Sequence, residues 1–152
     1  MPQIRVAVPG DVHQIQELAA EAPTASRWSA DHYESFFAPQ LVQDSLLFVA
    51  DHNGTVIGFL AARAVSGECE IESIVVRRSR QREGTGSELL KQLLSTVSGR
   101  VQRVFLEVRV SNQPAIRLYE SAGFSTVGRR KNYYQDPAED ALVMKKSLVE
   151  LD

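Results

Sequence analysis

The chain has little cysteine and no long apolar stretch. Cys69 is the single cysteine among 152 residues, so no disulfide can form within the chain. A free cysteine in a strand-like stretch is usually a small core residue, and such low cysteine usage fits the reducing cytoplasm. No segment approaches the roughly 18 apolar residues that a membrane-spanning helix needs, and the N-terminal MPQIRVAVPG is too polar for a signal peptide. We therefore expect a cytoplasmic protein that does not enter a membrane.

The chain also has no large excess of positive or negative charge. The 17 Lys and Arg residues nearly balance the 19 Asp and Glu residues, which gives a net charge of −2 and a pI of about 5.9. Proteins that bind nucleic acid through bulk charge are basic, so we expect no nucleic-acid partner. His13, His32 and His52 are scattered without the spacing of metal ligands, so we also expect no metal site.

The length and composition that are present indicate one globular domain. We assign residues 1–152 to it, because the chain has the size of a single domain and 43% hydrophobic residues. Apolar periodicity predicts, in order, a strand, helices, three strands, a helix, a strand, a helix and two strands, which is an α/β domain with a mixed sheet. The strands are expected at 4–8, on both sides of Asn53-Gly54 within 46–64, and at 68–76, 104–110, 125–130 and 141–148. The helices are expected from the N-cap Asp11 to Pro23, within 24–43 up to a break at Pro39, from Ser87 to Val97, and from the cap Asn112 to Gly123.

The most informative stretch is QREGTGSELLKQLL at 81–94, which follows the strand-like IESIVV at 71–76. Gly84 and Gly86 stand between that strand and an amphipathic helix. This arrangement presents backbone N–H groups and the positive end of the helix dipole, which favours an anion. Arginines at 77, 78, 80 and 82 add positive charge, although they could also form a solvated basic face. A pyrophosphate matches this combination best.

Two common nucleotide-binding motifs do not match the loop. A P-loop needs a lysine directly after the second glycine, where Ser87 stands, and a Rossmann fingerprint needs a third glycine where Leu89 stands. The remaining alternative is that the glycines only permit a tight turn from strand to helix. The residues of the loop alone leave this alternative open.

Several stretches resemble a known family. The loop from Gln81 to Gly86 resembles the acetyl-CoA pyrophosphate loop of the GNAT N-acetyltransferases. The block LEVRVSNQPAIRLYESAGF, then GRRKNYY and EDALVMKKSL, is similar to the RimI branch, the bacterial ribosomal-protein-alanine N-acetyltransferases. Trp28-Ser29 resembles the N-terminal region of that branch. The resemblance implies a single domain with a mixed, mostly antiparallel sheet flanked by helices. Glu70 and Glu72 depart from the pattern, because better-known members are less acidic there.

The resemblance also implies roles for individual residues. Glu107, mid-strand in FLEVRV, would be the general base, and the alternative is a solvent-facing carboxylate or an ion pair with Arg109. Glu70 is the second candidate base, and Tyr119 would protonate the leaving thiolate. Acetyl-CoA would contact Ile74, Val75, Val76, Arg82, Glu83, Gly84, Thr85, Gly86, Ser87, Asn112 and Tyr119. The acceptor would contact Glu70, Tyr133 and Tyr134, the last two in the connection between the final two strands.

The activity that the resemblance implies is acetyl transfer from acetyl-CoA to a protein N-terminal amine, the N-terminal alanine of a small-subunit ribosomal protein. An α-amine has a reference pKa of about 7.7–8.0, so part of it is neutral near pH 7 and a carboxylate is a sufficient base. The alternatives are another N-terminus, a lysine, a small amine, or a non-catalytic acyl-CoA-binding module. We expect a monomer or a weak homodimer.

Overall fold

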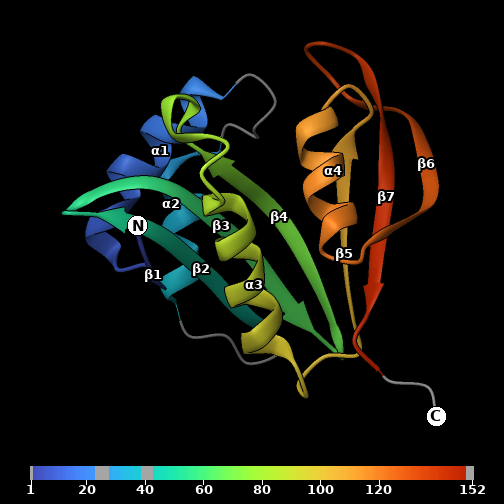
Figure 1. Ribbon diagram of the computed structural model, residues 1–152, viewed down its shortest axis with the longest axis horizontal. Coiled ribbons are helices and arrows are strands. Elements are labelled where there is room, and N and C mark those ends of the chain that lie inside the picture. Colours follow the sequence, from blue (N-terminus) through green and yellow to red (C-terminus); the bar gives the residue numbers. More distant parts are fainter. Residues whose placement is uncertain (1, 23–27, 39–42, 150–152) are drawn as a thin grey trace.

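The computed structural model describes residues 2–22, 28–38 and 43–149, and these form an α/β domain. Its elements follow one another as expected from the sequence (Figure 1). The strands are β1 (Gln3–Val6), β2 (Gln43–His52), β3 (Thr55–Val65), β4 (Glu68–Val76), β5 (Arg103–Arg109), β6 (Ser125–Tyr134) and β7 (Glu139–Ser147). The helices are α1 (Val12–Glu21), α2 (Ala30–Glu34), α3 (Thr85–Val97) and α4 (Gln113–Ser121), with 3-10 turns η1 (Pro9–Asp11), η2 (Ser35–Phe37) and η3 (Arg78–Arg80). None of the helices in the described ranges is long and apolar enough to cross a membrane.

All seven strands belong to one sheet in the order β1-β2-β3-β4-β5-β7-β6. The pairing of β4 with β5 is parallel, and the other pairs are antiparallel. The expected mixed, mostly antiparallel sheet is therefore confirmed.

The two parallel strands separate along their length. β4 and β5 pair over four residue pairs, from Glu68↔Arg103 to Ile71↔Leu106. Both strands then continue without pairing to each other, and in Figure 1 they diverge toward their C-terminal ends. A bulge places Glu72 as an extra residue in β4 where the pairing stops, because Ala62 pairs with Ile71 and Ala61 with Ser73. We call residues 72–76 of β4 and 107–109 of β5 the fork.

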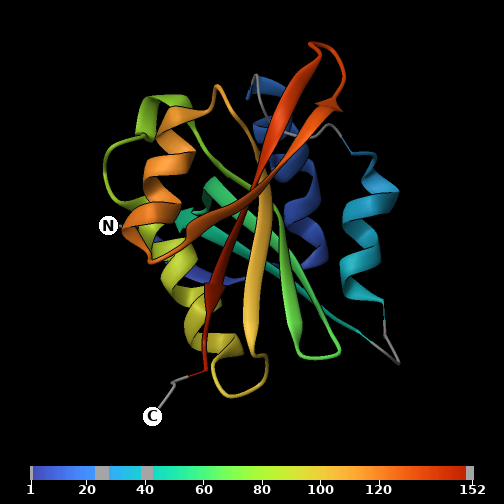
Figure 2. The same cartoon turned by 90° about the vertical axis from the view of Figure 1, so that its right-hand side faces the viewer.

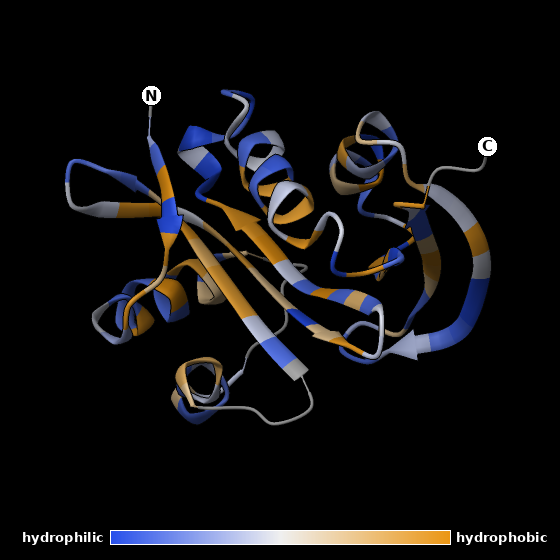
Figure 3. Ribbon diagram, turned by 90° about the horizontal axis from the view of Figure 1, so that it is seen from below, coloured by the Kyte–Doolittle hydropathy of each residue, from blue (hydrophilic) through white to orange (hydrophobic). Residues whose placement is uncertain are grey.

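Helices cover both faces of the sheet, as Figure 2 shows edge-on. Helices α1 and α2 cover one face, where Ile15, Tyr33 and Phe59 are completely buried. Helices α3 and α4 cover the other face, and Leu89 and Tyr119 are buried there. Figure 3 shows hydrophobic segments gathered in the central strands, whereas the edge strand β6 carries a run of hydrophilic residues. The fork thus has one face toward α2 and one face toward α3 and α4.

Several local signals are confirmed. Asn53 and Gly54 turn the β2–β3 hairpin with φ values of 53° and 90°. The Asn112 side chain caps α4 by accepting a hydrogen bond from the Ala115 N–H at 3.3 Å. Gly123 follows α4 with a φ of 97°, the left-handed backbone typical of a helix stop.

Some boundaries and one cap differ from expectation. The Asp11 carboxylate does not cap α1; it accepts a hydrogen bond from the Val8 N–H at 2.8 Å and pairs with Arg5, because a charged partner outcompetes the helix N–H groups. Tyr133 and Tyr134 are the last residues of β6 and not part of the turn, since β6 continues past a bulge to pair Tyr134 with Glu139. The expected breaks at Pro23 and Pro39 lie outside the described residues, and of the expected 24–43 helix the structure describes only α2 and η2.

Candidate active site

The backbone of β4 turns polar groups toward the fork beyond its last pair with β5. In an antiparallel pair, residues alternate between those whose N–H and C=O groups both point to the partner strand and those that point away. The Arg77 N–H donates to the Ile57 carbonyl of β3 at 2.7 Å, so Val75 also points to β3. Ile74 and Val76 therefore point toward β5, beyond the last β4–β5 pair. The Val76 carbonyl accepts a hydrogen bond from the Gln81 side chain at 3.2 Å, which agrees with this orientation.

The glycine loop lies at the mouth of the fork. Gly84 is the N-cap of α3 with a φ of 85°, and a Cβ atom added to it would meet only open space. A Cβ atom on Gly86 would lie 3.2 Å from Leu118 of α4 and 3.7 Å from Val76 of β4. Gly84 therefore leaves room for a ligand at the N–H groups of the first helical turn, whereas Gly86 allows α3 to pack close to the fork.

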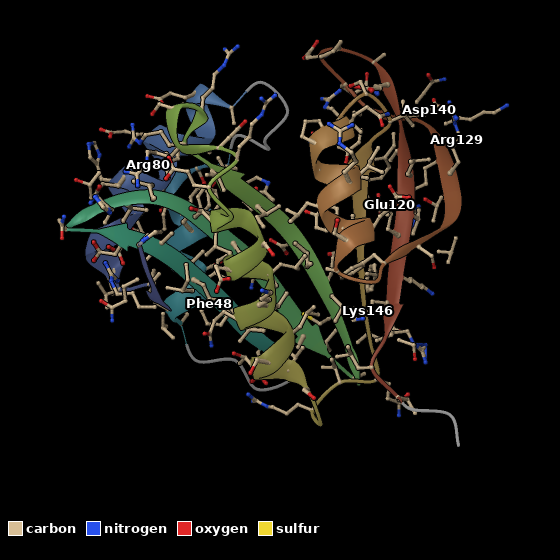
Figure 4. All side chains as sticks on the ribbon, viewed as in Figure 1. Phe48, Arg80, Glu120, Arg129, Asp140 and Lys146 are labelled. Atoms are coloured by element: carbon tan, nitrogen blue, oxygen red, sulfur yellow. The ribbon has the colours of Figure 1, made fainter. Side chains whose placement is uncertain are left out.

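Charged and hydroxyl groups surround this loop. Arg78 and Arg82 are exposed, whereas Arg80, labelled in Figure 4 above α3, pairs with Glu83 at 3.1 Å. The Thr85 hydroxyl is buried without a hydrogen-bond partner at the first position of α3. A phosphate group bound at this loop would meet positive charge from Arg78 and Arg82 and free backbone donors.

Two carboxylates from neighbouring strands face the fork on the α2 side. Glu70 of β4 is half-buried, and burial, then the nearby Glu72 and Glu107 carboxylates, raise its pKa. Glu107 of β5 has a side chain only 13% exposed, and its Oε1 lies 3.5 Å from Arg130 Nε. Its Oε2 is buried without a hydrogen-bond partner. An unpaired buried carboxylate oxygen is costly, so Glu107 is set to accept a hydrogen bond from a ligand.

The alternative pairing of Glu107 with Arg109 is wrong. Arg109 Nη1 lies 3.2 Å from Glu139 Oε1 and donates to the Pro137 carbonyl at 2.9 Å. Its guanidinium also lies 4.4 Å from the centre of the Tyr134 ring. Arg109 therefore fixes the β6–β7 turn and leaves Glu107 free of this partner.

Three tyrosines connect the two faces of the fork. Burial, and then Tyr134, raise the pKa of Tyr119, which is 4% exposed on α4. Burial, and then Glu107, raise the pKa of Tyr134 to about 12. Hydrogen bonding to Glu107 is the largest cause that raises the pKa of the more exposed Tyr133. Glu70, Glu107 and the three tyrosines thus influence one another's electrostatics around the fork.

Two features of the site have no clear signal in the sequence. Arg130 stands in GRRKNYY next to Arg129, and adjacent arginines on an edge strand do not reveal which one reaches Glu107. The second feature is an ion-pair network in which Glu72 accepts from Arg63 at 3.1 Å and lies 3.2 Å from His32 of α2. His32 is 40 positions from Glu72, and Arg63 is 9 positions away on the neighbouring strand β3, where the bulge at Glu72 shifts the register in a way that no local pattern predicts.

A strand fork with a helix N-terminus at its mouth defines a class of acyl-transferring enzymes, and comparisons with known proteins agree. The profile of the Acetyltransferase (GNAT) family matches residues 12–124. The chain belongs to this family and is an acetyl-CoA-dependent N-acetyltransferase.

The RimI-like character is also confirmed. The [Ribosomal protein bS18]-alanine N-acetyltransferase of Escherichia coli strain K12 is 39% identical over 114 residues, which cover 73% of this chain and 77% of that protein. A putative enzyme of the same description from Bacillus subtilis is 32% identical over 136 residues, covering 88% and 87%. The crystal structure of the ribosomal-protein-S18-alanine N-acetyltransferase from Escherichia coli superimposes with a TM-score of 0.86 at 32% identity, covering 100% of this chain and 97% of that one.

Proposed function

We propose that the protein transfers the acetyl group of acetyl-CoA to the N-terminal α-amine of a protein, an N-terminal alanine of a small-subunit ribosomal protein. The observation that carries this proposal is the fork, with Glu70 and Glu107 on one face and Tyr119 and the glycine loop on the other. A fork of this kind lets an acyl donor and an amine meet from opposite faces. The relatives named for N-terminal alanine acetylation support this acceptor.

The residues around the fork fit acetyl-CoA. The loop from Arg82 to Ser87 offers room at Gly84, free N–H groups at the start of α3, and the buried, unpaired Thr85 hydroxyl. The backbone of Ile74 and Val76 offers hydrogen bonds to the amide groups of the pantetheine arm. Asn112 at the start of α4 completes the proposed contacts, whereas Val75, also expected to contact acetyl-CoA, turns its backbone to β3 and its side chain into the α1–α2 core. Among the described residues, no group of His, Cys, Asp and Glu could hold a metal ion.

Glu107 is the proposed general base. It would accept a proton from the acceptor ammonium, and the neutral nitrogen would then bond to the acetyl carbon while the carbon–sulfur bond breaks. The nitrogen would lose its second proton as the neutral amide forms, which balances the proton that the leaving thiolate takes up. Backbone N–H groups of Ile74 and Val76 would stabilise the negative charge that develops on the carbonyl oxygen. Glu70, Tyr133 and Tyr134 would line the acceptor side, where negative charge favours a cationic amine.

Tyr119 is the proposed general acid. Burial raises its pKa, so the phenol keeps its proton throughout the physiological range. The leaving CoA thiolate would take this proton, and the second proton lost by the acceptor nitrogen would restore the phenol. A raised pKa makes the phenol a weaker acid, so its position on the α3–α4 face, and not its pKa, supports this role.

An acetylation assay across peptides tests the acceptor. A peptide that begins with alanine should be acetylated faster than the same peptide with other first residues. It should also outcompete a peptide with a blocked N-terminus and one internal lysine, because a lysine amine has a pKa of about 10.4 and is rarely neutral. Mass spectrometry would locate the acetyl group. A preference for the lysine peptide would place the chain in another branch of the family.

A further inference from the structure

We propose that Arg130 is a positioning residue that acts through Glu107: its guanidinium serves as a built-in counterion, which the ammonium group of the acceptor displaces on binding. This inference rests on the proposed function, because it takes an amine as the acceptor. It assigns a role in acceptor binding to the edge strand β6.

The register of the strands places Arg130 on the face of Glu107. Glu107 pairs with Val143 of β7, and Val143 pairs in turn with Gly128 of β6. Arg130 lies two residues beyond Gly128 and therefore on the same face of the sheet. Its Nε reaches diagonally over β7 to within 3.5 Å of Glu107 Oε1.

Arg130 is the one cation among the described residues that forms an ion pair with Glu107. The other charged or titratable groups facing Glu107 are Glu70 from β4 and Tyr133 and Tyr134 from β6. Two carboxylates on neighbouring strands repel each other, and Arg130 opposes this repulsion: it lowers the pKa of Glu70 where burial and the other carboxylates raise it. Without a cation, Glu70 would hold its proton at higher pH.

Several observations indicate that an ammonium group can take the place of Arg130 in its ion pair with Glu107. The Arg130 side chain is 58% exposed, so the pair contributes little free energy and opens easily. The pairing of β6 with β7 is irregular between Arg130 and Tyr134, which removes ladder restraints next to it. Arg130 leaves the second Glu107 oxygen without a partner. An ammonium group satisfies that oxygen and supplies the positive charge, so it replaces Arg130 at no net change of charge.

Neighbouring Arg129 provides a matched control. Its side chain is also 58% exposed, but it lies on the opposite face and pairs with Asp140 at 2.7 Å, as Figure 4 shows at the outer edge of the sheet. Arg129→Gln and Arg130→Gln therefore remove the same charge from the same strand with similar exposure. Arg130→Lys keeps the charge in place.

The first measurement is the titration of the glutamate carboxyl carbons by NMR in the free protein, with Glu70→Gln to assign the signal of the carboxylate that shares Arg130 with Glu107. Arg130→Gln should raise the pKa of Glu70 further, because it removes the cation that opposes burial and the neighbouring carboxylates. Arg130→Lys should restore most of the wild-type value, and Arg129→Gln should leave it unchanged. Equal shifts in Arg129→Gln and Arg130→Gln would overturn the proposal.

The second measurement is the kinetics with an N-terminal alanine peptide. For Arg130→Gln, measured on the pH plateau of kcat/KM, KM for the peptide should fall by up to about fivefold, or about 1 kcal/mol, because no counterion must be displaced. A higher KM would mean that Arg130 binds the acceptor directly, which contradicts the proposal. If the wild-type enzyme acetylated no N-terminus, the proposed function would fail, while the titration would still decide the role of Arg130 as counterion.

Discussion

Glu70 and Glu107 face the same fork from neighbouring strands, but their surroundings differ. Glu107 has one buried oxygen without a partner and one oxygen near a weakly held arginine. Glu70 has no ion pair among the described residues, and the carboxylates around it raise its pKa. A base that must take a proton from an ammonium group needs an oxygen that is free and oriented. Glu107 meets this condition better than Glu70.

Conservative substitutions separate the two carboxylates. Glu107→Gln should lower kcat by at least about 10²-fold, the lower end of the usual effect of losing a general base, with acetyl-CoA binding retained. Glu70→Gln should change kcat little. Raising the pH should partly rescue Glu107→Gln, since more of the acceptor amine is then neutral. Initial rates from pH 6 to pH 10 would check this, and near wild-type turnover of Glu107→Gln would refute its assignment.

In the same kinetic experiment, Tyr119→Phe should respond to pH differently from Glu107→Gln. The variant should lose at least about 10²-fold in kcat, while folding is preserved because no described hydrogen bond involves the phenol. Higher pH should not rescue it, because the missing proton donor is still missing. A pH rescue like that of Glu107→Gln would show that Tyr119 acts on the amine and not on the thiolate.

At the scale of elements, α3 and its glycine loop combine two steric requirements. Gly84 needs a left-handed backbone and faces open space, whereas Gly86 lies against Leu118 and Val76. Substitutions at the two glycines should therefore fail for different reasons. Gly86→Val should mainly disturb packing between α3, α4 and β4.

Gly84→Val should act on ligand binding more than on folding. A β-branched residue with positive φ costs about 1–2 kcal/mol, which a domain of this size can tolerate. Its side chain would point into the space proposed for the pyrophosphate. Calorimetric titration with acetyl-CoA, alongside chemical unfolding, would separate the two effects. Normal affinity in Gly84→Val would mean that the glycine serves only the turn.

The sequence predicts most elements because their signals are local. Asn53-Gly54, Asn112 and Gly123 each specify a turn or cap within a few residues, and the structure confirms them. The extent of β6 could not be predicted, since its bulge depends on pairing with β7. Arg130, the Glu72–His32 pair and the true partner of Arg109 depend on contacts between distant segments, which no local pattern contains.

At the scale of the molecule, ligand binding should raise the free energy of unfolding. A ligand that binds only the folded state adds about 2.7 kcal/mol at 100 times its Kd, which corresponds to roughly 5–10 °C in Tm for a chain of this size. Acetyl-CoA and CoA should produce shifts of this order, whereas NAD and ATP should produce far smaller ones. Differential scanning fluorimetry measures all four. Equal shifts would contradict a site that recognises both pyrophosphate and pantetheine.

The four residue pairs between β4 and β5 also have a mechanical meaning. They join two parts of the sheet, β1 to β4 and β5 to β7. Bending at this junction would disturb fewer backbone hydrogen bonds than bending between β2, β3 and β4 or between β5, β7 and β6, where more residues pair. A pantetheine arm bound along β4 would fill the fork and stiffen this junction. Binding would then restrict the relative motion of the two parts of the sheet, and the lost conformational entropy would lower the affinity. Release of CoA would restore this motion, so the same flexibility that weakens binding would favour product release and turnover.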